Sequence, residues 1–303
     1  MNASSIDRSG LALMLITILV WAGSWIAMKA VAPYIGPFHF AAVRYLGGAV
    51  VLFVAAIALR RPLSLPSWRL TLLIGLTQNA AFQCFVQLGL GQGSVGQVAL
   101  TTYTMPFWVV LLGWWLLGDR PSARHWSGIA LAAAGLLCFV APWKGLVGGL
   151  LPIGLGTVAG LFWGLGTVLA KRAFDRHAPD VLVFSAWQML LGGLAIAPVA
   201  LAVPQKALQW NGTLLLGMLY VVLIATALGY LLWMLVVRRV PASIAGLSGL
   251  GVPVVAVLMA WAFLGERPTQ DEALAMALIL AGLWTVSRAA RRPRAGSDDT
   301  VAP

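Results

Sequence analysis

Long apolar runs alternate with short polar clusters along nearly the whole chain of 303 residues. Each run has about 20 residues, which is the length that an α-helix needs to cross the hydrocarbon core of a bilayer. Glycines, prolines and charged residues fill the intervals between the runs, as is typical of turns. The pattern predicts ten membrane-spanning helices with the approximate bounds 11–32, 38–59, 69–90, 95–117, 124–142, 149–170, 180–203, 212–236, 241–264 and 270–289.

Composition places these runs in a membrane rather than in a soluble core. Hydrophobic residues make up 60% of the chain and charged residues 10%, whereas about a quarter of the residues of a soluble domain are charged. The net charge of +11 is spread over the intervals between the runs, not gathered on one soluble face as nucleic-acid binding requires. We therefore expect the lipid bilayer and no nucleic acid as a partner, and a monomer or weak oligomer.

Basic residues predict the orientation in the membrane. If the N-terminus is cytoplasmic, fifteen of the 20 lysines and arginines lie in or next to cytoplasmic loops and tails. The others lie on or near the outer side: Lys29, Arg44, Lys144, Lys206 and Arg267. Because cytoplasmic loops are enriched in lysine and arginine, both termini are expected inside, with cytoplasmic tails at 1–10 and 290–303.

One stretch of the chain occurs twice. Residues 106–121 read PFWVVLLGWWLLGDRP and residues 253–268 read PVVAVLMAWAFLGERP, with proline, glycine, acid, arginine and proline at the same spacings. Such self-similarity indicates two copies of one structural unit. Further upstream in each copy, a tryptophan precedes a lysine by eight residues: Trp21 and Lys29, and Trp163 and Lys171.

The two copies are predicted to be inverted repeats, at 11–142 and 149–289. Each copy holds five predicted spans, and because five is odd, the second copy enters the membrane from the opposite side. Inverted repeats are typical of secondary transporters, whose substrate site lies near the middle of the membrane between the halves. The predicted fold is all-helical, with ten transmembrane helices in two inverted five-helix repeats around a central cavity.

With these motifs the chain resembles the drug/metabolite transporter superfamily, specifically the EamA-type ten-helix exporters, from near residue 10 to near residue 290. The superfamily usually has glutamate where this chain has Asp119, and Gln188 stands one position out of register with Arg44. The residues that carry the resemblance are Trp21, Lys29, Arg44, Pro106, Gly118, Asp119, Arg120, Trp163, Lys171, Gln188, Pro253, Gly265, Glu266 and Arg267.

Within the superfamily the chain looks most like bacterial aromatic amino-acid exporters. The resemblance implies a secondary transporter of the bacterial inner membrane that exports amino acids, particularly aromatic and other neutral ones, by alternating access without ATP. A broad-specificity drug or metabolite exporter of the same superfamily is the first alternative. A membrane-embedded structural or enzymatic protein is the second.

The sequence shows no motif of catalysis or cofactor binding. HExxH, Walker A and GxSxG motifs are lacking, and Cys84 and Cys138 are too far apart for a CxxC site. No carboxylate falls in the middle of a predicted span, which argues against an ion site built on an intramembrane acid. We expect no enzyme activity, no catalytic residue, no metal and no cofactor, and we favour a facilitator or exchanger.

Charged residues near the spans are assigned structural roles. Arg44 is the charge deepest in an apolar run. It binds a substrate carboxylate or, as we favour because it lies close to its helix start, it reaches the outer interface. Charges at the ends of spans are expected to form ion pairs or to contact helix termini. The assigned residues are Lys29, Arg44, Asp119, Arg120, Lys171, Glu266 and Arg267.

Uncharged polar and aromatic side chains in the middle of spans are the candidate substrate-binding residues. Asn79, Gln83 and Gln87 share one helical face, which lines a cavity or bonds to a neighbouring helix. Trp21 and Trp163 lie away from the interfaces, and flat rings suit an aromatic cargo, although core packing is the alternative. The candidate set is Trp21, Gln78, Asn79, Gln83, Tyr103, Trp163, Tyr230 and Ser248.

Prolines and glycines predict breaks in the fourth span of each copy. A proline inside a membrane helix frees backbone carbonyls where a cavity can use them, although glycines also serve close packing. Gating or hinge roles are assigned to Pro106, Gly249, Gly251 and Pro253. Packing or lipid contact is expected for four further tryptophans of the first copy: Trp25, Trp108, Trp114 and Trp115.

Overall fold

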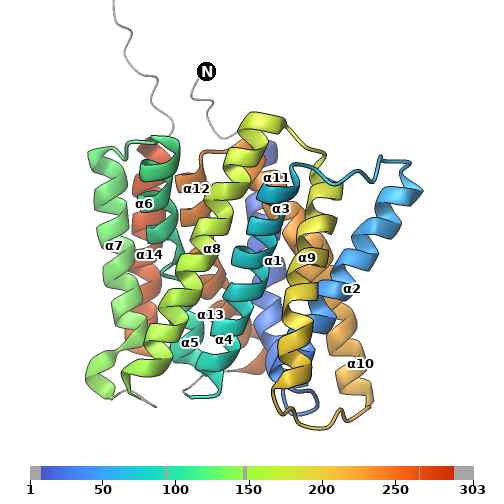
Figure 1. Ribbon diagram of the computed structural model, residues 1–303. Coiled ribbons are helices and arrows are strands. Elements are labelled where there is room, and N and C mark those ends of the chain that lie inside the picture. Colours follow the sequence, from blue (N-terminus) through green and yellow to red (C-terminus); the bar gives the residue numbers. More distant parts are fainter. Residues whose placement is uncertain (1–7, 93–94, 146–148, 266, 290–303) are drawn as a thin grey trace, which may run out of the picture.

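The computed structural model describes residues 8–92, 95–145, 149–265 and 267–289. Every regular element in these ranges is a helix, so the predicted all-helical fold is confirmed. The long helices run side by side across the molecule, and short loops join them at its two ends (Figure 1).

The elements of the first copy of the repeat are α1 (Arg8–Val31), α2 (Pro37–Ala58), α3 (Trp68–Ile74), η1 (Gly75–Ala81), α4 (Phe82–Leu90), α5 (Val95–Thr102), α6 (Met105–Leu117) and α7 (Ala123–Val140), followed by η2 (Pro142–Lys144). Those of the second copy are α8 (Leu150–His177), α9 (Val181–Ala202), α10 (Gly212–Leu219), η3 (Tyr220–Leu228), α11 (Gly229–Arg239), α12 (Ala242–Ser248), α13 (Gly251–Leu264) and α14 (Gln270–Ala289).

These elements make ten crossings, because α3, η1 and α4 form one continuous helix, and so do α10, η3 and α11. By length and composition, eight segments qualify as membrane spans. The other two crossings carry more polar residues. The α3–η1–α4 helix contains four amide side chains, and α14 carries Asp271 and Glu272 in its first turn.

Large apolar side chains cover the outside of the bundle. Trp115 is 79% exposed, Leu150 75% and Leu201 85%. A soluble monomer rarely exposes contiguous apolar surface on this scale, whereas in a bilayer this surface contacts lipid tails. Trp115 and Trp114, for which packing or lipid contact was expected, are exposed on this outer surface.

Corresponding helices of the two copies make equivalent contacts with the other copy, as in a pseudo-two-fold symmetric pair. The first helix of each copy packs against the third and fourth crossings of the other: α1 contacts α10, η3, α11 and α13, and α8 contacts α3, η1, α4, α5 and α6. The second crossings, α2 and α9, pack together, and so do the fifth crossings, α7 and α14 (Figure 1). The centre of the molecule is thus built from both copies.

The third crossing of each copy contains a π-helical segment. η1 covers Gly75–Ala81 and η3 covers Tyr220–Leu228, at equivalent places in the two repeats. A π-helix closes its hydrogen bonds from i to i+5, so side chains beyond it are rotated relative to an uninterrupted α-helix, and such segments are frequent at functional sites.

The fourth crossing of each copy is broken, as predicted. α5 ends at Thr102 and α6 begins at Met105, with Pro106 in its first turn. α12 ends at Ser248 and α13 begins at Gly251, two residues before Pro253. The two breaks meet, because a Cβ atom on Gly249 would lie 2.5 Å from Met105 Cε. The gating role assigned to these residues stays a prediction.

The repeated glycine-acid-arginine motif begins where a helix ends. Gly118 adopts the left-handed conformation (φ 76°), and its amide donates to the carbonyl of Trp114. Gly265 does the same in the second copy, with φ 71° and a bond to Trp261. Glycine takes this conformation without a Cβ penalty, which makes it the usual residue after a helix.

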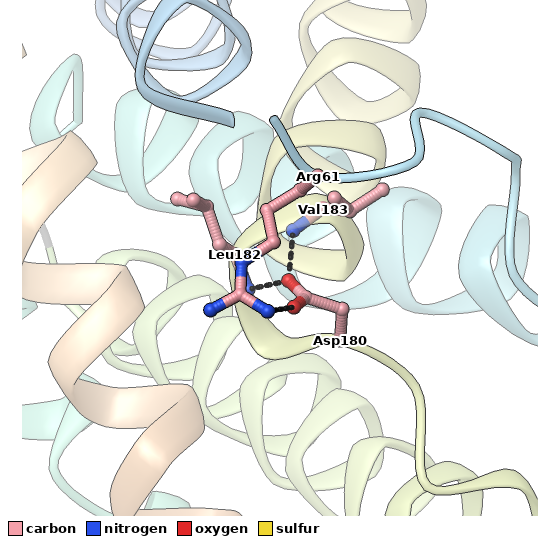
Figure 2. A network of polar contacts seen from close by, with 4 residues as sticks. All are labelled: Arg61, Asp180, Leu182 and Val183. Carbon is pink, nitrogen blue, oxygen red and sulfur yellow. Dashed lines mark hydrogen bonds and ion pairs between the residues drawn. The ribbon is translucent and has the colours of Figure 1, made fainter. Parts of the chain in front are cut away.

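The start of α9 is fixed by Asp180 (Figure 2). Its Oδ1 accepts hydrogen bonds from the amides of Leu182 (3.0 Å) and Val183 (3.1 Å), as a helix N-cap does. Its Oδ2 lies 3.7 Å from Arg61 Nη1, in the loop between α2 and α3. The second crossings of the two copies are therefore linked at this end as well as along their length.

Candidate functional site

Repeat-equivalent tryptophans meet at the centre of the bundle. The ring centroids of Trp21 (α1) and Trp163 (α8) are 5.4 Å apart, edge to face. Tyr230 of α11 lies 5.8 Å from the first ring and 5.5 Å from the second. Trp233, one turn further along α11, contacts both tryptophans at 5.4 and 5.9 Å. Aromatic pairs favour these offset and edge-to-face geometries.

A cavity of about 80 Å³, here called the inner cavity, adjoins this aromatic cluster. One water needs about 10–15 Å³ on this measure, so there is room for several waters. Five of the eight candidate residues line it, including Gln83 and Tyr103. The full lining is Trp21, Ser24, Trp25, Met28, Arg44, Phe82, Gln83, Val86, Thr102, Tyr103, Met105, Trp163 and Tyr230.

Gln78, Asn79 and Ser248 do not line the inner cavity. Gln78 Nε2 donates to Thr167 Oγ1 (3.1 Å) of α8, and Asn79 Nδ2 donates to the backbone carbonyl of Gln188 (2.9 Å) in α9. Ser248 Oγ donates to a carbonyl of its own helix. The first two side chains thus connect η1 to neighbouring helices, which is the alternative that the sequence left open for the amide face.

Asn79, Gln83 and Gln87, predicted to share one helical face, have different surroundings. Asn79 points to α9, whereas Gln83 lines the inner cavity and Gln87 lines a second cavity beside it. Asn79 lies within the π-helical segment η1, whereas the two glutamines follow it in α4.

The sequence placed Arg44 incorrectly and did not identify Trp25 as a cavity residue. Trp25, expected to pack or face lipid, lines both cavities and donates from Nε1 to the hydroxyl of Tyr103 (2.8 Å). Arg44, expected to reach the interface, is 7% exposed and lines the inner cavity. Its Nε donates to Thr226 Oγ1 (3.1 Å). A buried cation within a membrane span is itself a signal of a functional site, and the charge inside this apolar run was visible in the sequence.

A larger cavity of about 280 Å³, here called the outer cavity, shares Trp25 and Met28 with the inner one. Lys29 and Lys206 lie at its rim, and Lys206 Nζ donates to the carbonyl of Ala32 (2.6 Å). Its full lining is Trp25, Met28, Lys29, Val31, Ala32, Ile35, Pro37, Phe40, Gln87, Leu90, Gly91 and Lys206.

On the other side of the tryptophan cluster the molecule is closed. The space between α1, α11 and the α12–α13 break, where Thr17, Trp233 and Ser248 lie, leaves no volume for a water molecule. The central site is therefore accessible from the α1–α2 loop side alone among the described cavities. The basic-residue count predicts this side to be the outside, and with that orientation the two cavities open outward.

Of the remaining assigned charges within the described residues, Lys29 lines the outer cavity and the others lie outside both cavities. Lys171 Nζ forms an ion pair with Asp175 (3.1 Å) one turn along α8. Asp119 lies nearby: desolvation raises the pKa of its carboxyl and the Lys171 charge opposes this shift. Arg120 and Arg267 are exposed. Glu266 lies outside the described residues.

Comparisons with known proteins agree on one family. A model of the EamA-like transporter family matches residues 8–141 and again residues 150–288. A protein of Salmonella typhimurium named as a probable amino-acid metabolite efflux pump is 27% identical over 287 residues, covering 90% of this chain and 92% of the relative. Its Escherichia coli namesake is 26% identical over 286 residues, with the same coverage.

Two further similarities extend over nearly the whole chain. A protein of Bacillus subtilis named as an uncharacterized transporter is 26% identical over 277 residues, covering 88% of this chain and 92% of the relative. One crystal structure superposes with a TM-score of 0.81 at 20% identity and covers 94% of this chain and 99% of its own. At that identity the superposition supports the fold.

Proposed function

The chain belongs to the EamA-like transporter family and is a multi-pass membrane transporter, and from this premise we propose that it exports amino acids, particularly aromatic and other neutral ones. The cargo crosses the bacterial inner membrane by alternating access, without ATP. The inner cavity supports this choice of cargo, because aromatic rings from both repeats line it.

The chemistry of the cavity suits this cargo. Ring faces and edges of Trp21, Trp163 and Tyr230 surround the space, and they favour an aromatic or large apolar side chain. Gln83 brings an amide whose Nε2 has no hydrogen-bond partner among the described residues, and it is free to bond to the polar end of a ligand. Selected relatives named as amino-acid metabolite efflux pumps support the same class of cargo.

Transport down the gradient of the cargo fits the same site. None of the described residues that line the two cavities is an acid, and carboxylates are the usual proton and sodium ligands of coupled transporters. We therefore propose a facilitator or exchanger rather than a pump driven by the proton gradient.

Flux measurements with purified protein in liposomes test the proposal. Labelled phenylalanine should enter without ATP and at an equal rate with and without a pH gradient, faster than lysine. Trp163→Ala should lower the phenylalanine rate by about tenfold or more, because the ring contributes contacts to several aromatic partners, each worth about 0.5–1.5 kcal/mol.

The matched control is Trp115→Ala, which removes the same side chain from the lipid-facing surface, where it is 79% exposed. This variant should transport phenylalanine normally. Equal losses in the two variants would contradict the assigned site. Flux of a cationic dye without any amino-acid flux would instead support the broad-specificity drug exporter.

A further inference from the structure

Arg44 is a buried cation within a membrane-spanning helix. It lies in α2, is 7% exposed and lines the inner cavity. The guanidinium carbon lies 5.3 Å from the ring centroid of Tyr45 and 5.6 Å from that of Phe40. Ring faces partly stabilise a cation, but a charged side chain at this depth is costly, and it normally marks a substrate or ion site whose partner has to be identified.

The described protein supplies no anionic partner for Arg44. A guanidinium carries five N–H donors. One hydrogen bond goes from Nε to Thr226 Oγ1 (3.1 Å), and Nη1 makes a long contact with Met28 Sδ (3.9 Å). The ion pairs seen in the described residues join other side chains. The planar end of the guanidinium is therefore available to an anion that enters the cavity.

The charges that surround the path to Arg44 have the same sign. Lys29 and Lys206 line the outer cavity, through which a ligand reaches the inner one. Two basic residues at the entrance and one at the end attract an anion and repel a cation. Among the described lining residues, a ligand ammonium group finds only ring faces and neutral oxygens.

From these contacts we propose that Arg44 binds the carboxylate of the cargo, and that the site accepts aromatic carboxylates without an amino group and discriminates against the corresponding amines. The planar fork of arginine matches a carboxylate with two parallel hydrogen bonds, while Trp21 and Trp163 hold the ring. The inference rests on the proposed function, since it names the group by which the amino-acid cargo is recognised.

Equilibrium binding to the purified full-length protein tests the proposal with two probes that differ in one group. 3-Phenylpropanoate keeps the ring and the carboxylate of phenylalanine, and phenethylamine keeps the ring and the amine. In the wild type, 3-phenylpropanoate should bind at least tenfold more tightly than phenethylamine, measured by titration calorimetry at pH 7.

Arg44→Gln should weaken binding of 3-phenylpropanoate by about 10- to 100-fold, the effect of losing hydrogen bonds to a charged group. It should leave binding of phenethylamine unchanged or tighten it, because the repelling charge is gone, and a misfolded variant cannot show a gain. Arg44→Lys keeps the charge without the planar fork and should fall between. Lys206→Gln, which removes one charge at the entrance, should change either affinity less than about threefold.

Several outcomes would overturn the proposal. Equal affinities for the two probes in the wild type would do so, and so would an Arg44→Gln variant that binds 3-phenylpropanoate as the wild type does. If neither Arg44 variant folds, the ratio of the two wild-type affinities decides alone. Phenylalanine flux in the wild type judges the proposed function separately, because it can persist when the carboxylate assignment fails.

Discussion

Two glycines of α8 provide a direct measure of how tightly the two repeats pack. Gly166 faces η1 of the other repeat: a Cβ atom on it would lie 2.4 Å from Gln78 Cβ and 3.1 Å from Gln78 Cα. Carbon atoms in contact are normally about 3.5–4.0 Å apart. Alanine at Gly166 therefore requires α8 and η1 to separate by about 1 Å or more, since backbone atoms cannot rotate away.

The cost of Gly166→Ala can be worked from these contacts. Overpacking of this kind costs about 1–3 kcal/mol. The separation also stretches the bond from Gln78 to Thr167, now 3.1 Å, whose loss costs about 1 kcal/mol. We expect a loss of about 2–4 kcal/mol of the free energy of unfolding, measured by denaturant titration of the purified protein in detergent. Phenylalanine flux should fall as well, because Trp163 lies one turn away.

Gly154→Ala in the same helix is the control. Nothing lies within 4 Å of a Cβ atom at Gly154, so the variant should equal the wild type or gain up to about 1 kcal/mol from the higher helix propensity of alanine. Equal stabilities for the two alanine variants would refute the close contact between α8 and η1, and with it the interlocked arrangement of the repeats.

Other parts of the structure give further expected outcomes. Asp180→Ala should lower the free energy of unfolding by about 1 kcal/mol through loss of the α9 cap, whereas Arg61→Gln should cost less than about 0.5 kcal/mol because its ion pair is exposed; thermal unfolding compares them. Desolvation raises the pKa of the Asp119 carboxyl in the folded state, so its charging opposes folding as pH rises. Asp119→Asn should thus be more stable than the wild type at pH 7 and equal to it at pH 3, as parallel melts would show. Gln83→Leu, which removes the amide from the inner cavity, should raise the KM for phenylalanine severalfold, while Ser248→Ala should leave it unchanged in flux assays.

The architecture was predictable because two physical constraints act on the whole chain. The thickness of the bilayer fixes the length of every crossing, so the ten predicted ranges agree with the ten observed crossings. Duplication fixes the positions of repeated features, so the breaks beside Pro106 and Pro253 could be placed from the sequence. Both constraints are visible in single residues and their spacing.

The lining of the site was less predictable because it depends on helix rotation. Asn79 donates to α9 from within the π-helical η1, whereas Gln83 lines the inner cavity from α4. No residue in Gly75–Ala81 is of a type that predicts a π-helix. Arg44 lies few residues from the start of α2, so from the sequence its long side chain could have reached the interface, but its guanidinium bonds across to Thr226 of the second repeat.

Some features of the site occur in both repeats, whereas others occur in only one. Inverted repeats exchange conformations when the access side changes, so features needed in both states recur in both copies: the central tryptophans, the π-helices and the broken helices. Arg44 has no basic counterpart. The nearest is Gln188, whose Nε2 and Oε1 are buried without partners among the described residues. A carboxylate bound at Arg44, as proposed above, would stay attached to the first repeat while the second repeat moves around it, so the tryptophan cluster rather than the cation would open on the cytoplasmic side.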